Sequence, residues 1–265
     1  MRMGEWSPEI VRFMEDAARV SDYFPTLARE VADGLAPGSR VCDAGCGMGQ
    51  LAVELARIGH AVDAVDKSLA AVAVARSLVA RERLQELVSV RQADFRLWDE
   101  AACCDRMIFC LSASVSDAFA AACDAGAKSL VVVNKVHPRF EYKDEYLGGR
   151  PIVKDVRAEY LDLEEAGIVC GVREMELDFG QPFRTLADAK RYFSLFRTRK
   201  YPLGATAADV ERELIQVPNA EFPWYLPVKR RLSVFEVDMD ASLRNLQESV
   251  CGRVTRRQRE QRRIA

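Results

Sequence analysis

The stretch Val41-Cys42-Asp43-Ala44-Gly45-Cys46-Gly47-Met48-Gly49 decides the fold, because its three alternating glycines join a predicted buried strand to a predicted helix. Glycine lacks Cβ, so it tolerates a positive φ and lets a ligand approach the backbone closely. The helix that begins near Gln50 offers free N–H groups and the positive end of its dipole. We therefore predict that a polar ligand binds across this turn. The alternative is a tight strand–helix turn without a ligand, but three alternating glycines are more than such a turn needs.

The spacing of the glycines favours one class of ligand. Gly45 and Gly47 match the first two glycines of the G-x-G-x-x-G pattern of dinucleotide sites, but Gln50 occupies the third position. The pattern here is D-x-G-x-G-x-G, and it begins at Asp43. In this pattern the chain resembles the class I S-adenosylmethionine (SAM)-dependent methyltransferases. An NAD-dependent oxidoreductase is the disfavoured alternative.

Strand and helix patterns alternate along most of the chain. The region 7–35 is predicted to be helical, and Ser7-Pro8-Glu9 is typical of an N-cap followed by a first-turn proline. Strands alternating with helices indicate βαβ units and a mainly parallel sheet. The predicted strands are 40–43, 61–65, 88–92, 107–111, 129–136, 168–177 and 232–237, and the predicted helices are 49–58, 68–83, 115–123, 156–166 and 185–196.

The predicted fold class is α/β: a doubly wound, seven-stranded, mostly parallel sheet with helices on both faces and an N-terminal helical cap. The resemblance implies that the last strand, near 231–238, runs antiparallel between the fifth and sixth strands. The Pro-rich run 218–227 predicts an ordered but irregular lid. We expect a helical cap (1–35), a SAM-binding Rossmann-like methyltransferase domain (36–240) with a lid insertion near 200–229, and a basic C-terminal tail (241–265).

Acidic residues extend the predicted ligand site. Asp66 ends the second strand, where a carboxylate can accept hydrogen bonds from both hydroxyls of a ribose. Asp63, on the same strand, is interpreted as a solvent or edge residue. The resemblance implies that Asp94 binds the adenine amino group and that Phe95 meets the adenine ring. The predicted residues for SAM, and for its product S-adenosylhomocysteine, are Asp43, Gly45, Cys46, Gly47, Gly49, Asp66, Lys67, Asp94, Phe95, Cys110 and Leu111.

The predicted acceptor site lies at the end of the fourth strand, Cys110-Leu111-Ser112-Ala113, because open α/β sheets bind ligands outside the carboxyl ends of their strands. This end lacks the Asn-Pro-Pro-Tyr or Asp-Pro-Pro-Tyr motif of DNA and protein amide methylators. Aromatic residues in 1–35, 137–150 and 200–229 suit an apolar pocket for a small molecule, or ordinary core between cap and sheet. His137 and Tyr23 are candidate general bases.

The composition of the chain limits which partners, metal sites and cellular locations are expected. The 265 residues are 49% hydrophobic and 29% charged with a net charge of -2, which is typical of a globular chain without a basic field for nucleic acid. No apolar run reaches the ~20 residues of a membrane span, and the N-terminus lacks a signal-peptide pattern. The 8 Cys form no C-x-x-C pair and there are only 2 His, so we expect reduced thiols, no metal site and a cytoplasmic location.

Together these patterns predict a SAM-dependent methyltransferase that acts by in-line displacement on a small, partly apolar organic acceptor, as a monomer or homodimer without a membrane partner. One alternative is an RNA or protein methyltransferase, for which the arginine cluster at 255–263 would matter; we interpret that cluster as a solvated terminus. Another is a non-catalytic SAM-binding protein or nucleotide-binding regulator. The sequence leaves the acceptor and the methylated atom open.

Overall fold

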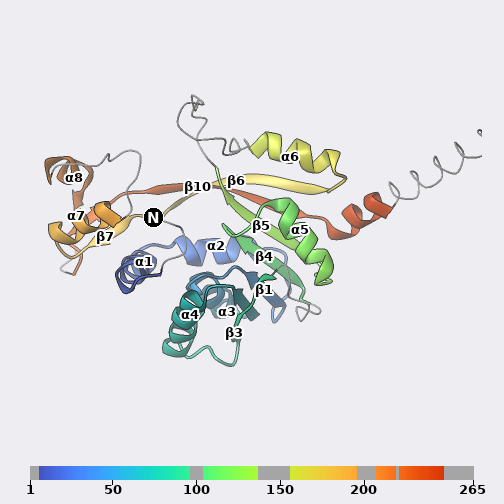
Figure 1. The fold of residues 1–265 in the computed structure, drawn as a ribbon, viewed down its shortest axis with the longest axis horizontal. Coiled ribbons are helices and arrows are strands. Elements are labelled where there is room, and N and C mark those ends of the chain that lie inside the picture. The colour runs from blue at the N-terminus through green and yellow to red at the C-terminus, as the bar shows by residue number, and fades with distance from the viewer. Residues whose placement is uncertain (1–5, 96–103, 137–155, 196–206, 219–220, 248–265) are drawn as a thin grey trace, which may run out of the picture.

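A seven-stranded sheet runs through the centre of the computed structural model, which describes residues 6–95, 104–136, 156–195, 207–218 and 221–247 (Figure 1). The strand order is β3-β2-β1-β4-β5-β10-β6. Strand β10 pairs antiparallel with both β5 and β6, whereas the pairs among β1 to β5 are parallel. The predicted fold class, with its inserted antiparallel last strand, is therefore confirmed. The bounds are β1 Arg40–Ala44, β2 Ala61–Asp66, β3 Val88–Gln92, β4 Arg106–Cys110, β5 Leu130–Lys135, β6 Cys170–Asp178 and β10 Lys229–Val237.

Helices cover both faces of this sheet. Successive residues of a strand point to opposite faces, so Ile108 of β4 packs in one core while Met107 and Phe109 pack in the other. The first core includes α2, α3 and part of α4; the second includes α5 and α6. The bounds are α2 Tyr23–Val31, α3 Gln50–Arg57, α4 Leu69–Arg81, α5 Val115–Asp124 and α6 Val156–Glu165.

The helix starts follow the capping residues in the sequence. Ser7 precedes α1 (Pro8–Val20), and its Oγ accepts a hydrogen bond from Ile10 N at 3.3 Å. Ser68 caps α4 in the same way. These side chains satisfy amide groups that a helix start leaves without partners, which is why the predicted starts fall at these residues.

The chain between β6 and β10 forms a second unit (Figure 1), in which the helix over 185–196 was predicted but the small sheet was not. It holds a three-stranded antiparallel sheet of order β7-β9-β8 with two helices. The expectation of irregular structure over 218–227 is wrong for β9, because that strand pairs with β7 and β8. The bounds are β7 Gln181–Phe183, α7 Leu186–Leu195, α8 Ala207–Glu213, β8 Ile215–Gln216 and β9 Trp224–Leu226.

Helix α1 packs against this unit, and we call the two together the cap. The Phe13 ring lies 6.1 Å from that of Phe183 and 5.3 Å from that of Tyr192, centroid to centroid. Arg12 Nη2 donates to Asp188 Oδ1 at 2.9 Å, and Arg184 makes a bidentate pair with Asp16. Segments from opposite ends of the chain thus build one cap, whereas α2 belongs to the core of the main sheet.

Asp63 is buried, which corrects its interpretation as a solvent or edge residue. Its Oδ2 accepts from Arg40 Nε at 2.7 Å and its Oδ1 accepts from Ser89 Oγ at 2.5 Å. A buried carboxylate needs such partners, and here they come from the neighbouring strands β1 and β3. Among the described helices, none combines the length and apolar character needed to cross a bilayer.

Candidate active site

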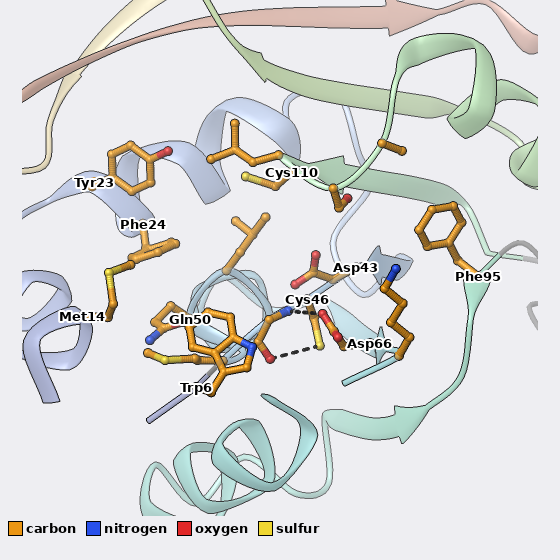
Figure 2. Close-up of a pocket in the computed structure, with 18 of the residues that line it drawn as sticks. Trp6, Met14, Tyr23, Phe24, Asp43, Cys46, Gln50, Asp66, Phe95 and Cys110 are labelled. Atoms are coloured by element: carbon orange, nitrogen blue, oxygen red, sulfur yellow. Dashed lines mark hydrogen bonds between the residues drawn. The ribbon is translucent and has the colours of Figure 1, made fainter. Parts of the chain in front are cut away.

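A cavity of about 460 Å³ lies at the carboxyl ends of β1, β2 and β4 (Figure 2). Asp66 and Phe95 stand on one side of it, and Tyr23 and Phe24 stand on the other. The cavity joins the turn after β1 to side chains of α1 and α2. Its lining residues are Trp6, Met14, Tyr23, Phe24, Asp43, Gly45, Cys46, Gly47, Met48, Gln50, Leu51, Asp66, Lys67, Phe95, Cys110, Leu111, Ser112, Ala113, Asp117 and Arg230.

The three glycines after β1 all have positive φ, but for different physical reasons. A Cβ on Gly45 would lie 2.4 Å from Ser112 Cβ, and one on Gly49 would lie 3.0 Å from Ala75 Cβ. Among the described residues, the nearest neighbour of a Cβ on Gly47 would be the Trp6 ring, at 3.8 Å. Gly45 and Gly49 therefore allow close packing within the protein, while Gly47 keeps the cavity side of the turn open.

Asp66 holds the glycine turn in place. Its Oδ2 accepts a hydrogen bond from Gly47 N at 2.9 Å, and its Oδ1 accepts one from Ser68 N at 2.8 Å. A carboxylate oxygen has capacity for a second donor. Asp66 can therefore fix the turn and still accept hydrogen bonds from hydroxyls of a bound ligand.

Asp43 is a buried acid beside the cavity. It is 1% exposed, and its Oδ2 has no hydrogen-bond partner in the part of the chain that the structure describes. Burial, followed by the charge of Asp66, raises the pKa of Asp43 to about 7, while an amide hydrogen bond from Ala52 opposes the rise. An orphaned buried acceptor favours a ligand that brings a donor or a positive charge.

Tyr23 and the cavity thiols are neutral at physiological pH. Burial is the largest cause that raises the pKa of Tyr23 to about 12, and Arg230 opposes it. Burial and then the charge of Asp43 raise the pKa of Cys110 to about 12, and burial raises that of Cys46 well above its ordinary value. These groups can donate hydrogen bonds or pack, but they are not charged nucleophiles.

The backbone turns sharply where β4 ends at the cavity. Leu111 has φ +58°, a left-handed conformation that is uncommon outside glycine. Its N donates to Val133 O at 2.8 Å, and Ser112 Oγ donates to Ala44 O at 2.8 Å. These bonds to β5 and β1 hold a strained residue at the edge of the cavity, as is common at functional sites.

Most of the predicted site residues come together in this cavity. Gly49 and Asp94 do not line it: Gly49 is the N-cap of α3, and Asp94 is partly buried next to Phe95. His137, the segment 137–150 and the arginine cluster lie outside the described residues. The predicted residues that line the cavity are Tyr23, Asp43, Gly45, Cys46, Gly47, Asp66, Lys67, Phe95, Cys110 and Leu111.

Sequence reasoning missed several lining residues. Met48, Gln50 and Leu51 belong to the glycine turn and the start of α3, so their proximity to the site was a usable signal. Arg230 stands near the start of β10, far along the sequence, and no motif marks it. Phe95, by contrast, was predicted from sequence. Its ring lies 4.9 Å from that of Phe109, centroid to centroid, in an edge-to-face contact.

Comparisons with known proteins agree with this geometry. A family model described as a methyltransferase domain matches residues 41–130. The YcgJ protein from Bacillus subtilis is 14% identical, with 81% of this chain and 97% of that chain covered and a TM-score of 0.51. A SAM-dependent methyltransferase from Aquifex aeolicus is 16% identical, with 88% and 99% covered and a TM-score of 0.50. A search of curated proteins finds no match.

A third similar structure is phosphoethanolamine N-methyltransferase 2 from Haemonchus contortus, in complex with phosphomonomethylethanolamine and S-adenosylhomocysteine. It is 14% identical, with 82% of this chain and 52% of that chain covered and a TM-score of 0.50. At such identities the three structures show a shared fold.

The sheet order, the glycine turn after β1 and the family match define an enzyme of the class that transfers methyl groups. Residues 41–130 match a methyltransferase domain, and the sheet has the fold of the class I SAM-dependent methyltransferases, whose cofactor is SAM. The cavity fits that cofactor, because Gly47 leaves room at the backbone and Asp43 presents a buried oxygen that no described residue hydrogen-bonds.

Proposed function

We propose that this enzyme methylates a small, partly apolar organic molecule. The observation that carries the proposal is a single cavity with two different ends (Figure 2). The glycine turn, Asp43 and Asp66 form a polar end. Met14, Phe24 and Tyr23 form an end with apolar and aromatic side chains, the kind of lining typical of small-molecule sites.

In this proposal the polar end binds the cofactor. Asp66 accepts from the ribose hydroxyls, the Gly47 backbone lies against the ligand, and Phe95 packs against the adenine, while the role of Asp94 at the adenine amino group stays a prediction. Asp43 supplies a buried negative charge near the sulfonium and ammonium groups. When bound, SAM supplies an electrophilic methyl group and leaves as S-adenosylhomocysteine.

At the other end, the chain mainly orients the acceptor and excludes water, which suits an in-line displacement. Because burial keeps Tyr23 protonated, we propose that its hydroxyl donates a hydrogen bond to the acceptor, in place of the base role expected from sequence. A proton lost by an oxygen or nitrogen acceptor then goes to water or to another group, for which His137 stays a prediction.

Calorimetric titration with S-adenosylhomocysteine and NAD tests the cofactor part of the proposal. We expect saturable binding of S-adenosylhomocysteine alone. Preferential binding of NAD would contradict the proposal.

A truncation tests the class of acceptor. Deleting residues 253–265 removes the arginine cluster, and we expect unchanged S-adenosylhomocysteine affinity and unchanged methylation of a small acceptor. Tight RNA binding that weakens steeply with salt and disappears with the truncation would favour the RNA methyltransferase alternative.

A further inference from the structure

Arg230 places a guanidinium at the aromatic end of the cavity. The side chain is half-buried, and its Cζ lies 3.7 Å from the ring centroid of Phe179 and 5.3 Å from that of Tyr23. Stacking on Phe179 supports one face of the guanidinium, while the N–H donors at its edges point outward in the plane of the group.

The basic neighbours of Arg230 on β10 have acidic partners. Lys229 Nζ lies 2.9 Å from Glu176 Oε1, and Arg231 Nη2 lies 2.8 Å from Glu174 Oε2. Within the described residues Arg230 has no such carboxylate partner. A half-buried charge without a counterion is costly to desolvate, so the site favours an anionic occupant.

The titratable groups around Arg230 do not neutralise it. Tyr23 and Cys110 are protonated at neutral pH because burial raises the pKa of each to about 12. Lys135, at the end of β5, is a second cation: partial desolvation, and then the charge of Arg230, lower its pKa. Lys135 does not line the cavity, so among the described residues Arg230 is the basic residue that an acceptor at this end would meet.

The two ends of the cavity therefore carry side chains of different charge. Asp43 and Asp66 lie at the cofactor end, where Lys67 also lines the cavity, and their carboxylates can complement a positively charged sulfonium. Arg230 lies among the aromatic residues at the other end. A neutral acceptor would leave this guanidinium unpaired and shielded from water, whereas a single negative charge would balance it.

We propose that the methyl acceptor carries a carboxylate that Arg230 binds through paired N–H donors, while its apolar or aromatic body packs against Tyr23 and Phe24. This inference rests on the proposed function, because it concerns the acceptor end of the same cavity. A carboxylate matches both the planar fork and the single charge of one guanidinium.

Matched acid and amide pairs test this inference. The protein saturated with S-adenosylhomocysteine is titrated calorimetrically with 4-hydroxybenzoate against 4-hydroxybenzamide, and with indole-3-acetate against indole-3-acetamide. We expect at least one acid to bind about tenfold to hundredfold more tightly than its amide. If no acid is preferred although S-adenosylhomocysteine binds, the inference is overturned and the proposed function stands; if S-adenosylhomocysteine does not bind, both fail.

Variants assign the preference to Arg230. Arg230→Gln should abolish the acid preference without changing S-adenosylhomocysteine affinity, and Arg230→Lys should restore part of it. Arg231→Gln, which removes an exposed paired arginine on the same strand, should keep the full preference. An acid preference that survives Arg230→Gln, or an equal loss of S-adenosylhomocysteine affinity in that variant, would overturn the inference, and thermal denaturation verifies that each variant is folded.

Discussion

At the scale of single residues, neighbouring glycines of the turn after β1 have different roles: two allow close packing, and one faces the cavity. Gly45 and Gly49 lack side chains because Ser112 and Ala75 occupy the space beside them, and Gly47 leaves the cavity open. Asp66 then connects the turn to the end of β2 through Gly47 N. Neighbouring glycines of one motif should therefore respond differently to substitution.

Valine at Gly47 and valine at Gly45 should give opposite patterns. Both positions have positive φ, so both variants carry comparable backbone strain. Gly45→Val adds a steric clash with Ser112 and should lower the melting temperature more. Gly47→Val should fold but bind S-adenosylhomocysteine weakly or not at all. Calorimetry and thermal denaturation measure both quantities, and normal affinity with normal stability in Gly47→Val would argue against a ligand-facing turn.

Asp66→Ala should weaken S-adenosylhomocysteine binding by at least ~1–3 kcal/mol, because it removes the proposed ribose acceptor and the partner of Gly47 N. Asp63→Asn is the matched control, since Asp63 is on the same strand but does not line the cavity. That variant should lower thermal stability and keep ligand affinity. Unchanged affinity in Asp66→Ala, measured by calorimetry, would remove Asp66 from the proposed site.

At the scale of elements, the cap depends on contacts between α1 and the unit inserted after β6. Phe13 anchors the apolar contact, and the pair of Asp16 with Arg184 crosses the same interface. Asp16 is buried, whereas the Arg191–Glu9 pair lies at the cap surface with side chains that are 57% and 31% exposed. The two pairs should therefore differ in importance.

Arg184→Ala should loosen the cap, because it leaves buried Asp16 without its bidentate partner. We expect a cost of about 1–3 kcal/mol, below that of a fully buried pair, since the Arg184 side chain is partly exposed and Arg12 and Arg19 remain near Asp16. Hydrogen exchange should show faster opening of α1 with unchanged protection of α3.

Arg191→Ala is the control for the cap, because exposed ion pairs contribute little. It should leave the exchange of α1 amides nearly unchanged. Equal protection of α1 in the Arg184 and Arg191 variants would show that the buried pair does not hold the cap.

At the scale of the whole molecule, Asp43 couples the cavity to the pH dependence of folding. Burial and the charge of Asp66 raise its folded-state pKa from 3.8 to about 7. The folded protein therefore binds this proton more tightly than the unfolded chain. The resulting stabilisation is fully present below the unfolded pKa and is lost as the pH rises through the folded pKa.

Asp43→Asn should remove that loss, because an amide stays uncharged at every pH. Without ligand, its free energy of unfolding relative to the native sequence should rise between about pH 4 and about pH 7, by up to a few kcal/mol. Urea denaturation across this range measures the difference, in which the contributions of other carboxylates cancel. Parallel pH profiles for the two proteins would contradict the raised pKa of Asp43.

The sequence by itself determined the main sheet, the helix starts at Ser7 and Ser68, and the polar end of the cavity around Gly47 and Asp66. These features depend on short-range rules, since alternation, capping and turn residues act within a few positions of the chain. Strands of one parallel sheet also end at a common edge, so their last residues could be assigned to one site.

Only the tertiary structure decided which residues meet across long sequence separations. From the sequence, Asp63 was interpreted as a solvent or edge residue. In the structure, β1 and β3 place Arg40 and Ser89 beside it as hydrogen-bond donors. The small sheet of the cap depends on β9 pairing with β7 and β8, and Arg230 reaches the cavity only because β10 inserts between β5 and β6. Burial and charge pairing are properties of the folded neighbourhood, so no local pattern can determine them.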